Sequence, residues 1–183
     1  MSVEIRKWKP ELAEDFEKES GRLHKALLTK GVRVAAPEHV GSTAARLDGK
    51  NIIDIAIRVS NLHEMGVVRD VLAGLGYVEG HDTHPERIFM ARRAHSETAS
   101  EGDFCGGAET REGDFHVHIV AAGSEEYRKM IWFRDFLLEH PGKAQEYTRL
   151  KYHLAKAEFP RKEYKKRKSE WIESLLREEF DEG

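Results

Sequence analysis

The most constraining feature of the sequence is the strict alternation of side chains over residues 51–59. The side chains of a β-strand point alternately to the two faces of its sheet, so this run predicts a strand with one continuous apolar face. The apolar positions are Ile53, Ile55, Ile57 and Val59, and the positions between them are Asp54, Ala56 and Arg58. Residues 114–121 alternate in the same way, with Phe115, Val117 and Ile119 against His116, His118 and Val120. The two predicted strands therefore carry Asp54, His116 and His118 opposite to their apolar faces.

Apolar residues at helical spacing predict one helix before these strands, one between them and three after them. The predicted helices cover residues 8–28, 62–75, 127–138 and 143–158, and a last helix follows Pro160. Residues 32–36, 77–78 and 87–92 have the shorter patterns of strands. Residues 94–113, rich in Gly, Ser, Thr and Glu, are the candidate for a flexible insertion. This order predicts an α+β core with a helical C-terminal part.

The composition excludes several classes of protein. A length of 183 residues fits one domain, and a formal net charge of −3 is unlike that of a dedicated nucleic-acid-binding protein. The single cysteine, Cys105, excludes an intrachain disulfide and a zinc site built on several cysteines. The sequence lacks both the run of about 20 apolar residues that spans a membrane and the apolar core of a signal peptide. We therefore expect a soluble, cytoplasmic protein without a membrane partner.

Charge is unevenly distributed near the C-terminus. Residues 149–168 contain nine Lys or Arg and two Glu, whereas residues 170–183 contain six acidic residues and one Arg. A charge-rich helix is usually a solvated face, but its cations are also candidates to hold a triphosphate or an RNA backbone. These candidates are Lys151, Arg161, Lys165 and Lys168. The aromatic residues among and after them have helical spacing that favours core packing over base stacking: Tyr152, Tyr164 and Trp171.

A Gly-Ser turn follows the first predicted strand. A turn at Gly41 and Ser42 leaves room for a phosphate to reach backbone N–H groups, and the Asp54 carboxylate on the next strand can hold a divalent cation that bridges to that phosphate. Taken alone, the turn is more typical of a ligand-free tight turn. Asp54 is then a structural carboxylate satisfied by the Gly41–Ser42 backbone, and the preceding His39 is a packing or capping residue.

Three segments together resemble the GrpB family of the nucleotidyltransferase superfamily. They are HVGSTA at residues 39–44, KNIIDI at residues 50–55 and FHVHIV at residues 115–120. The C-terminal half is similar to this family as far as Ile172, and residues 94–113 are the least similar. The resemblance implies a small mixed β-sheet with helices packed behind it and a C-terminal helical part. We therefore predict a nucleotidyltransferase-like core over residues 1–125, with helices over residues 126–183 packed on it as a single structural unit.

The resemblance also implies polymerase-like chemistry, in which carboxylates hold Mg²⁺ ions that orient a nucleoside triphosphate. This sequence has Ala56 where the superfamily has its second carboxylate, and His116 and His118 where a strand brings the third. Imidazole ligands favour Zn²⁺ or Mn²⁺ over Mg²⁺. We predict Asp54, His116 and His118 as ligands of a divalent metal ion (Mn²⁺, Zn²⁺ or Mg²⁺), and Asp54 and His118 as catalytic residues. The alternative for the histidines is a polar rim that faces solvent.

The phosphate-binding residues predicted with this site are Gly41, Ser42, Arg87, Lys151 and Lys168. Arg87 precedes the insertion, where it is either a phosphate clamp or a solvated charge. The leading hypothesis is a protein that binds a nucleotide or another phosphate-bearing molecule, RNA included, and catalyses metal-dependent nucleotidyl transfer. One alternative is a non-catalytic nucleotide- or RNA-binding module with a degenerate active site. Another is an interaction protein whose cleft is vestigial.

Overall fold

The computed structural model describes residues 3–80, 84–93, 114–157 and 159–180. The predicted insertion at residues 94–113, with Cys105, lies outside these ranges. The described residues form a five-stranded sheet with the strand order β1-β2-β5-β4-β3. In chain order the strands are β1 (Glu38–Val40), β2 (Ile53–Val59), β3 (Val78–Glu79), β4 (Arg87–Arg92) and β5 (Phe115–Ala121). Strands β2 and β5 are parallel and the other neighbours are antiparallel, so the sheet is mixed.

The register of β2 against β5 decides where the predicted site residues meet. Asp54 pairs with His116, and Ala56 pairs with His118 two residues further on. Because residues two apart in a strand share a face, all four lie on the same face of the sheet. Ala56 has only a methyl group, and this leaves room beside Asp54 for the ring of His118.

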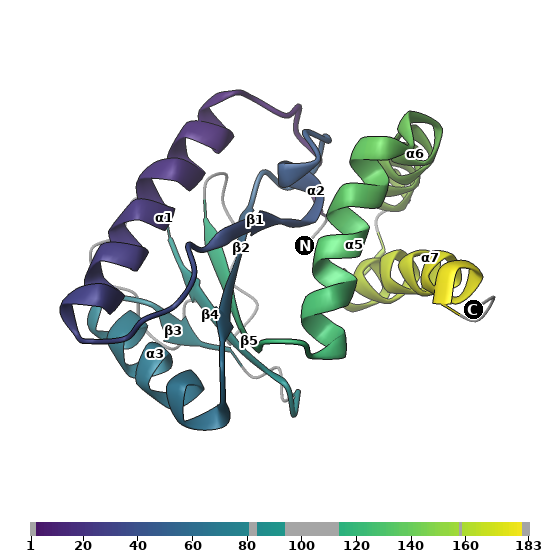
Figure 1. Cartoon of the computed structure of the whole chain (residues 1–183). Coiled ribbons are helices and arrows are strands. Elements are labelled where there is room, and N and C mark those ends of the chain that lie inside the picture. The colour runs from purple at the N-terminus through teal and green to yellow at the C-terminus, as the bar shows by residue number, and fades with distance from the viewer. Residues whose placement is uncertain (1–2, 81–83, 94–113, 158, 181–183) are drawn as a thin grey trace.

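Helices α1 (Glu11–Thr29) and α3 (Leu62–Gly74) cover the opposite face of the sheet (Figure 1). The strand residues with no exposed surface on that face are Ile53, Ile55, Ile57, Val117 and Ile119. Their burial is the apolar layer that the alternation predicts. Helix α1 begins at Glu11 rather than Trp8, because Pro10 is its N-cap residue and the Trp8 indole N–H donates to the Thr43 carbonyl at 3.0 Å.

Three long helices follow the sheet and lie on the side away from α1 and α3 (Figure 1). They are α5 (Glu125–Glu139), α6 (Pro141–Lys156) and α7 (Arg161–Phe180). Together with the short helix α2 (Gly41–Ala44) and the residue after it, they enclose a second apolar core. Its buried members are Ala45, Phe133, Leu137, Ala144 and Tyr147. The division of the chain at residue 125 stays a prediction. Within the described ranges, every helix is too short or too polar to cross a membrane.

The strand predicted at residues 32–36 is wrong. Val32 and Val34 pack against the core, so their alternation reflects burial of an extended segment that lacks ladder pairing. Pairing with β2 starts only at Glu38, opposite Ala56. The residue before it, Pro37, has no N–H group to donate to a ladder, and this places the first strand after the proline.

Candidate functional site

The predicted site residues converge on one cavity of about 580 Å³ between the sheet and helices α6 and α7. Those that line it are Ser42, Asp54, Arg87, His116, His118, Lys151 and Lys168. The remaining one, Gly41, adjoins it, since a Cβ atom added to Gly41 would lie 2.8 Å from Oδ2 of Asp54. The structure thus brings together residues from widely separated parts of the sequence. The ligand that they bind stays a prediction.

The Asp54 carboxylate lies between two imidazole rings. Its Oδ1 is 3.4 Å from Nδ1 of His116 and 3.6 Å from Nε2 of His118. In the described part of the chain the partners of Asp54 are these rings, rather than the backbone of Gly41 and Ser42. Burial by itself would raise the pKa of Asp54, but the contacts with both histidines hold that pKa well below its ordinary value. The carboxylate is therefore ionised at neutral pH.

The two rings line the cavity and are mostly shielded from solvent, unlike a rim that faces solvent. Each side chain is only 16% exposed. Phe89 of β4 packs over both, with its ring centre 5.0 Å from that of His116 and 5.4 Å from that of His118. Burial lowers the pKa of His116 more than the Asp54 carboxylate raises it, so this ring is neutral at pH 7. Neutral imidazole is the form that binds metal ions.

The donor atoms of a metal site are therefore present, but they are not gathered around a common point. Among the residues that the structure describes, no group of three His, Cys, Asp or Glu side chains is arranged to hold a metal ion. The Nδ1 atom of His118 is buried without a hydrogen-bond partner in the same part of the chain. Contact with Asp54 and with the Phe89 ring thus holds this side chain in place.

Cations outnumber acids along the cavity wall. Asp54 is the only carboxylate among the described lining residues, whereas the basic residues are Lys50, Arg87, Lys151, Lys165 and Lys168. Arg87 donates to Glu126 at 2.8 Å, so its charge is partly compensated from outside the cavity. The remaining excess of positive charge favours an anionic ligand.

Lys151 is the most buried of these cations, at 2% exposure. Its Nζ donates to the backbone carbonyl of Asp48 and lies 4.7 Å from the centre of the Tyr147 ring. Burial and the nearby Lys168 lower the pKa of Lys151 to about 7, against the effect of Asp48. Burial also lowers the pKa of Lys168, although the Asp54 carboxylate opposes this shift. An anionic ligand would raise both pKa values and bind both side chains as ammonium groups.

Tyr147, Tyr164 and Phe89 line the cavity and were not among the predicted site residues. The predicted core packing is confirmed for Tyr164, which is only 3% exposed, but it is wrong for Tyr152, which is 38% exposed. The sequence contains only a partial signal for both tyrosines. Each precedes a lysine of the cavity by four residues, Tyr147 before Lys151 and Tyr164 before Lys168, and residues four apart share one face of a helix.

His39 is a packing residue, as the sequence predicts. Its ring stacks on Phe16 with 4.4 Å between ring centres, and its Nε2 lies 3.1 Å from Oγ1 of Thr43. Burial lowers the pKa of His39 to about 4, against the Asp54 carboxylate and together with the Arg134 guanidinium. The ring is therefore neutral in the folded protein at pH 7.

This depressed pKa makes stability depend on pH. In the unfolded chain His39 takes up a proton near its ordinary pKa of about 6.5. Its stabilising contribution is therefore complete above that pH and falls as the pH drops toward the folded value of about 4. We expect the wild type to lose about 2 kcal/mol more stability than a His39→Phe variant between pH 7.5 and pH 5. Urea unfolding at both pH values measures this, and the same loss in both proteins would contradict it. A His63→Phe variant, which removes an exposed histidine, is the control.

Gly80 supports the ring that packs over the two histidines. A Cβ atom added there would lie 2.5 Å from Cδ1 of Phe89, so the ring would have to move toward His116 and His118. We expect Gly80→Ala to lower the free energy of unfolding by about 1–2 kcal/mol. The control is Gly66→Ala in α3, where an added Cβ atom meets nothing within 4 Å. That variant should be stabilised, because alanine favours a helix interior. If urea unfolding gives the same change in the free energy of unfolding for Gly80→Ala and Gly66→Ala, Phe89 is not constrained by Gly80.

Comparison with known proteins identifies a family that the sequence of this chain matches. The family model described as GrpB protein matches residues 2–178. The UPF0157 protein YqkA of Bacillus subtilis is 30% identical over 176 residues, which are 94% of this chain and 46% of YqkA. The UPF0157 protein BH1888 of Halalkalibacterium halodurans is 26% identical over 181 residues, which are 96% of this chain and 82% of that protein. The chain thus spans less than half of YqkA and most of BH1888.

Solved structures share the fold. The conserved protein GrpB from Enterococcus faecalis has a TM-score of 0.66 at 23% identity, over 94% of this chain and 99% of that chain. A variant of the Cid1 poly(U) polymerase bound to MgATP has a TM-score of 0.52 at 12% identity, over 80% of this chain and 42% of that chain. These similarities confirm the predicted nucleotidyltransferase-like α+β fold. At such identities they concern the fold alone.

Proposed function

The chain belongs to the GrpB family, and we propose that its cavity binds the phosphate groups of a nucleotide together with one divalent metal ion. The strongest support for this proposal is that two opposite walls of the cavity carry complementary groups. One wall, from β2 and β5, carries the ionised Asp54 beside two imidazoles that are mostly shielded from solvent, and the other, from α6 and α7, carries Lys151 and Lys168. A metal ion on the first wall and cations on the second suit a ligand with several phosphate oxygens.

The metal would be held by Asp54, His116 and His118. Ligand atoms about 2.0–2.2 Å from a tetrahedral ion are separated by roughly 3.3–3.5 Å, and Oδ1 of Asp54 is 3.4 Å and 3.6 Å from the two ring nitrogens. These distances fit an ion after small movements, although the donors are not preassembled. We infer that metal binds weakly to the protein alone and more tightly with the nucleotide, whose phosphate oxygens complete the coordination shell. The two imidazoles favour Mn²⁺ or Zn²⁺ over Mg²⁺.

The size and charge of the cavity suit a nucleotide. Its volume of about 580 Å³ lies within the range of ordinary small-molecule sites. Phe89, Tyr147 and Tyr164 provide apolar surface, and the lysines provide charge. RNA is a further candidate ligand, because a nucleotide at the end of an RNA chain carries the same phosphate group.

Catalysis of nucleotidyl transfer is the second candidate function, supported by the fold shared with the Cid1 poly(U) polymerase. The small number of carboxylates in the cavity favours nucleotide binding without nucleotidyl transfer. A two-metal mechanism needs several carboxylates, and Asp54 is the one carboxylate among the described lining residues, with Ala56 beside it. We therefore rank the binding module first.

Calorimetric titration tests the proposal. ATP, GTP, CTP and UTP are each titrated into the metal-free protein with Mg²⁺, with Mn²⁺ and with no metal. We expect binding of at least one nucleotide, with affinity increased by Mn²⁺. The absence of heat with all four, in protein shown to be folded, would refute the proposal. Release of pyrophosphate from a nucleotide by the unaltered chain, lost in an Asp54→Asn variant, would replace the binding module by an enzyme.

Lys168 lies on the wall of the cavity that α7 forms, and its role can be tested separately. Replacing Lys168 by Gln removes a cation that lines the cavity, and we expect nucleotide affinity to fall about tenfold. Lys162 lies on the same helix but is exposed and outside the cavity, so Lys162→Gln is the matched control. Calorimetric titration of both variants with the same nucleotide measures the difference. Equal affinities would mean that Lys168 does not contact the ligand.

A further inference from the structure

Among the described residues, Lys151 is a buried basic residue without a counter-ion. It is 2% exposed, and in the same part of the chain no carboxylate lies within ion-pair distance of its Nζ atom. The polar groups that Nζ contacts there are neutral, namely the backbone carbonyl of Asp48 and the face of the Tyr147 ring. Burying an ammonium group without a counter-ion is costly, and a lysine avoids this cost by releasing its proton. The geometry therefore favours the neutral amine in the protein alone.

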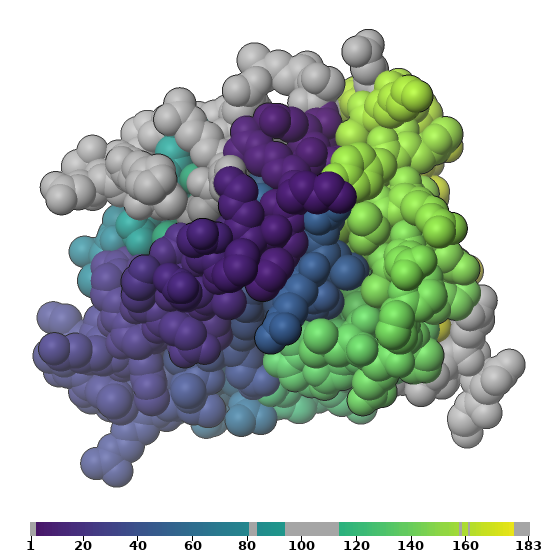
Figure 2. Space-filling view, turned by 90° about the horizontal axis from the view of Figure 1, so that it is seen from above, coloured from purple at the N-terminus to yellow at the C-terminus, as the bar shows by residue number. Residues whose placement is uncertain are grey.

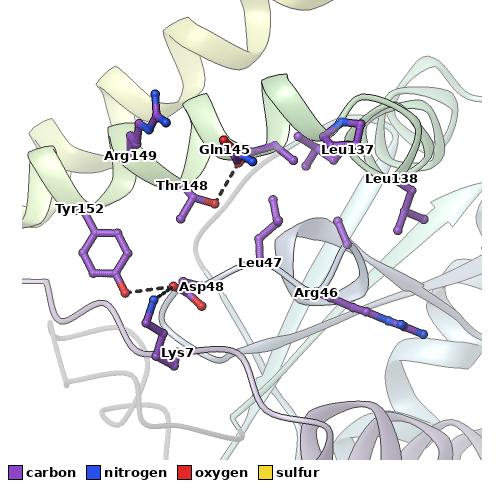
Figure 3. A pocket seen from close by; sticks show the side chains of 13 residues that line it. Lys7, Arg46, Leu47, Asp48, Leu137, Leu138, Gln145, Thr148, Arg149 and Tyr152 are labelled. Carbon is purple, nitrogen blue, oxygen red and sulfur yellow. Dashed lines mark hydrogen bonds and ion pairs between the residues drawn. The ribbon is translucent and has the colours of Figure 1, made fainter.

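The Asp48 carboxylate acts on Lys151 only from a distance, because it is bound to other residues. It accepts hydrogen bonds from Lys7 at 2.8 Å and from the Tyr152 hydroxyl at 3.1 Å (Figure 3), and from the backbone N–H of Trp8 at 2.9 Å. These contacts belong to the region shown in Figure 2, where the N-terminal segment lies against the loop after α2 and against α6. Asp48 thus joins the N-terminal segment to α6, whereas Lys151 lines the cavity of about 580 Å³.

The other charged groups that face Lys151 are mostly cations. Lys168, on α7, is close enough to oppose protonation of Lys151. Tyr147 and Tyr164 stay uncharged up to pH 9, because burial raises the pKa of both hydroxyl groups. Asp54 is held by the two imidazoles on the opposite wall. The remaining titratable groups of the described cavity wall are Lys50, Arg87, His116, His118 and Lys165.

There is room for an anion beside Nζ of Lys151. A Cβ atom added to Gly49 would lie 3.5 Å from this nitrogen and 3.4 Å from Oγ of Ser42, and glycine leaves that space to the cavity. Burial and Lys168 lower the pKa of Lys151 to about 7, far below the ordinary lysine value of about 10.4. A phosphate oxygen in this space would supply the missing counter-ion and raise that pKa again.

We propose that an anionic ligand binds in this cavity together with a proton, which Lys151 takes up, so that pH controls the affinity. The inference rests on the proposed function, since it concerns the same cavity. The amine of Lys151 and a solvent proton form the ammonium group, and a phosphate oxygen of the ligand becomes its counter-ion. Because the pKa of Lys151 is higher in the complex than in the protein alone, the affinity is greatest below pH 7 and falls as the pH rises.

Calorimetric titration of the wild type with ATP in the absence of metal tests this coupling. The heats measured in Tris and in HEPES at pH 8 differ by the difference in buffer ionisation enthalpy multiplied by the number of protons taken up. We expect an uptake of about one proton per ATP, and an affinity at least about tenfold lower at pH 9 than at pH 7. Histidines and phosphates change charge mainly below pH 7, so they contribute little over this range.

Inorganic tripolyphosphate, which has the phosphates but no base, is the second probe. ATP binding without proton uptake, and with equal affinity at pH 7 and pH 9, would overturn this inference and leave the proposed function standing. Proton-coupled binding of tripolyphosphate, with no nucleotide bound, would refute the proposed function and support this inference. If tripolyphosphate and all four nucleotides fail to bind, both are overturned.

Variants assign the proton to Lys151. Lys151→Arg stays charged at every pH used, so its affinity for ATP should change less than about twofold between pH 7 and pH 9. Lys151→Met, which has a similar length and no charge, should bind ATP more weakly at pH 7 and without proton uptake. Lys156→Gln, at an exposed position of α6 outside the cavity, is the control and should keep the wild-type uptake. Proton uptake that persists in both Lys151 variants would show that another group takes up the proton and would overturn the proposal.

Discussion

An Asp54→Asn variant should lose metal-dependent nucleotide binding, with an apparent affinity at least about 100-fold below that of the wild type. Asp54 is the one carboxylate that lines the described part of the cavity, and its Oδ1 faces both imidazole rings. An amide oxygen carries no charge to offset that of a divalent cation, and the ion would then rest on the imidazoles and the phosphates alone. Calorimetric titration of nucleotide in the presence of Mn²⁺ measures the loss.

Two comparisons make this result specific. Asp70→Asn removes an exposed carboxylate of α3, paired with Arg69 at the surface, and should leave nucleotide affinity unchanged. Titration without metal should show little difference between Asp54→Asn and the wild type, because the lysine wall is intact in both. Unaltered Mn²⁺-dependent binding in Asp54→Asn would mean that the metal is not held by Asp54.

Gly41→Ala should damage both stability and binding. Gly41 has a φ of +73°, a left-handed conformation that an alanine adopts only with strain. An added Cβ atom would also lie 2.8 Å from Oδ2 of Asp54 and displace the carboxylate from the rings. We expect the free energy of unfolding to fall by about 2–3 kcal/mol and nucleotide binding to weaken by at least tenfold, or about 1.4 kcal/mol.

Gly123→Ala separates the two causes. Gly123 has a similar φ of +76°, but an added Cβ atom meets nothing within 4 Å. This variant should show the effect of backbone strain alone. We expect its free energy of unfolding in urea to fall by about 1–2 kcal/mol and its nucleotide binding to be unchanged. If Gly41→Ala behaves like Gly123→Ala in both measurements, the close approach of the turn to Asp54 has no functional consequence.

The strand faces of this protein can be predicted from sequence because alternation depends only on local geometry. The apolar sides of β2 and β5, and with them the placement of Asp54, His116 and His118 on the opposite face, follow from the period of two. The parallel pairing that sets Asp54 opposite His116 does not follow from the period, because it depends on which strands are neighbours. The family resemblance, rather than the alternation, indicated that these residues form one site.

The first strand was misplaced because an extended, half-buried segment and a paired strand have the same alternation. Val32 and Val34 are packed against the core, but the hydrogen-bonded ladder starts after Pro37. A groove of about 700 Å³, which Leu47, Leu138 and Tyr152 help to line, was not predicted for a different reason. It is built from short stretches of the N-terminal segment, the loop after α2, α5 and α6, and its lining has no sequence pattern of its own.

The lysines that α6 and α7 contribute to the cavity were predicted only in part. Lys151 and Lys168 were singled out from a basic stretch in which most cations remain exposed, such as Lys162 and Lys166. Charge density alone does not tell which lysines point inward. A tyrosine four residues before a lysine does not settle this either, because Tyr152 precedes Lys156 in the same way and both of these side chains are exposed.

The measurement that tests the central claim most directly is the effect of Mn²⁺ on the histidine ring signals in the NMR spectrum of the isotope-labelled protein. The unpaired electrons of Mn²⁺ broaden the signals of nuclei close to the ion. With substoichiometric Mn²⁺ and ATP, we expect the signals of His116 and His118 to broaden first, while those of the exposed His63 and His153 stay sharp. Broadening of His63 and His153 with His116 and His118 unaffected would show that the ion binds outside the cavity and would contradict the account.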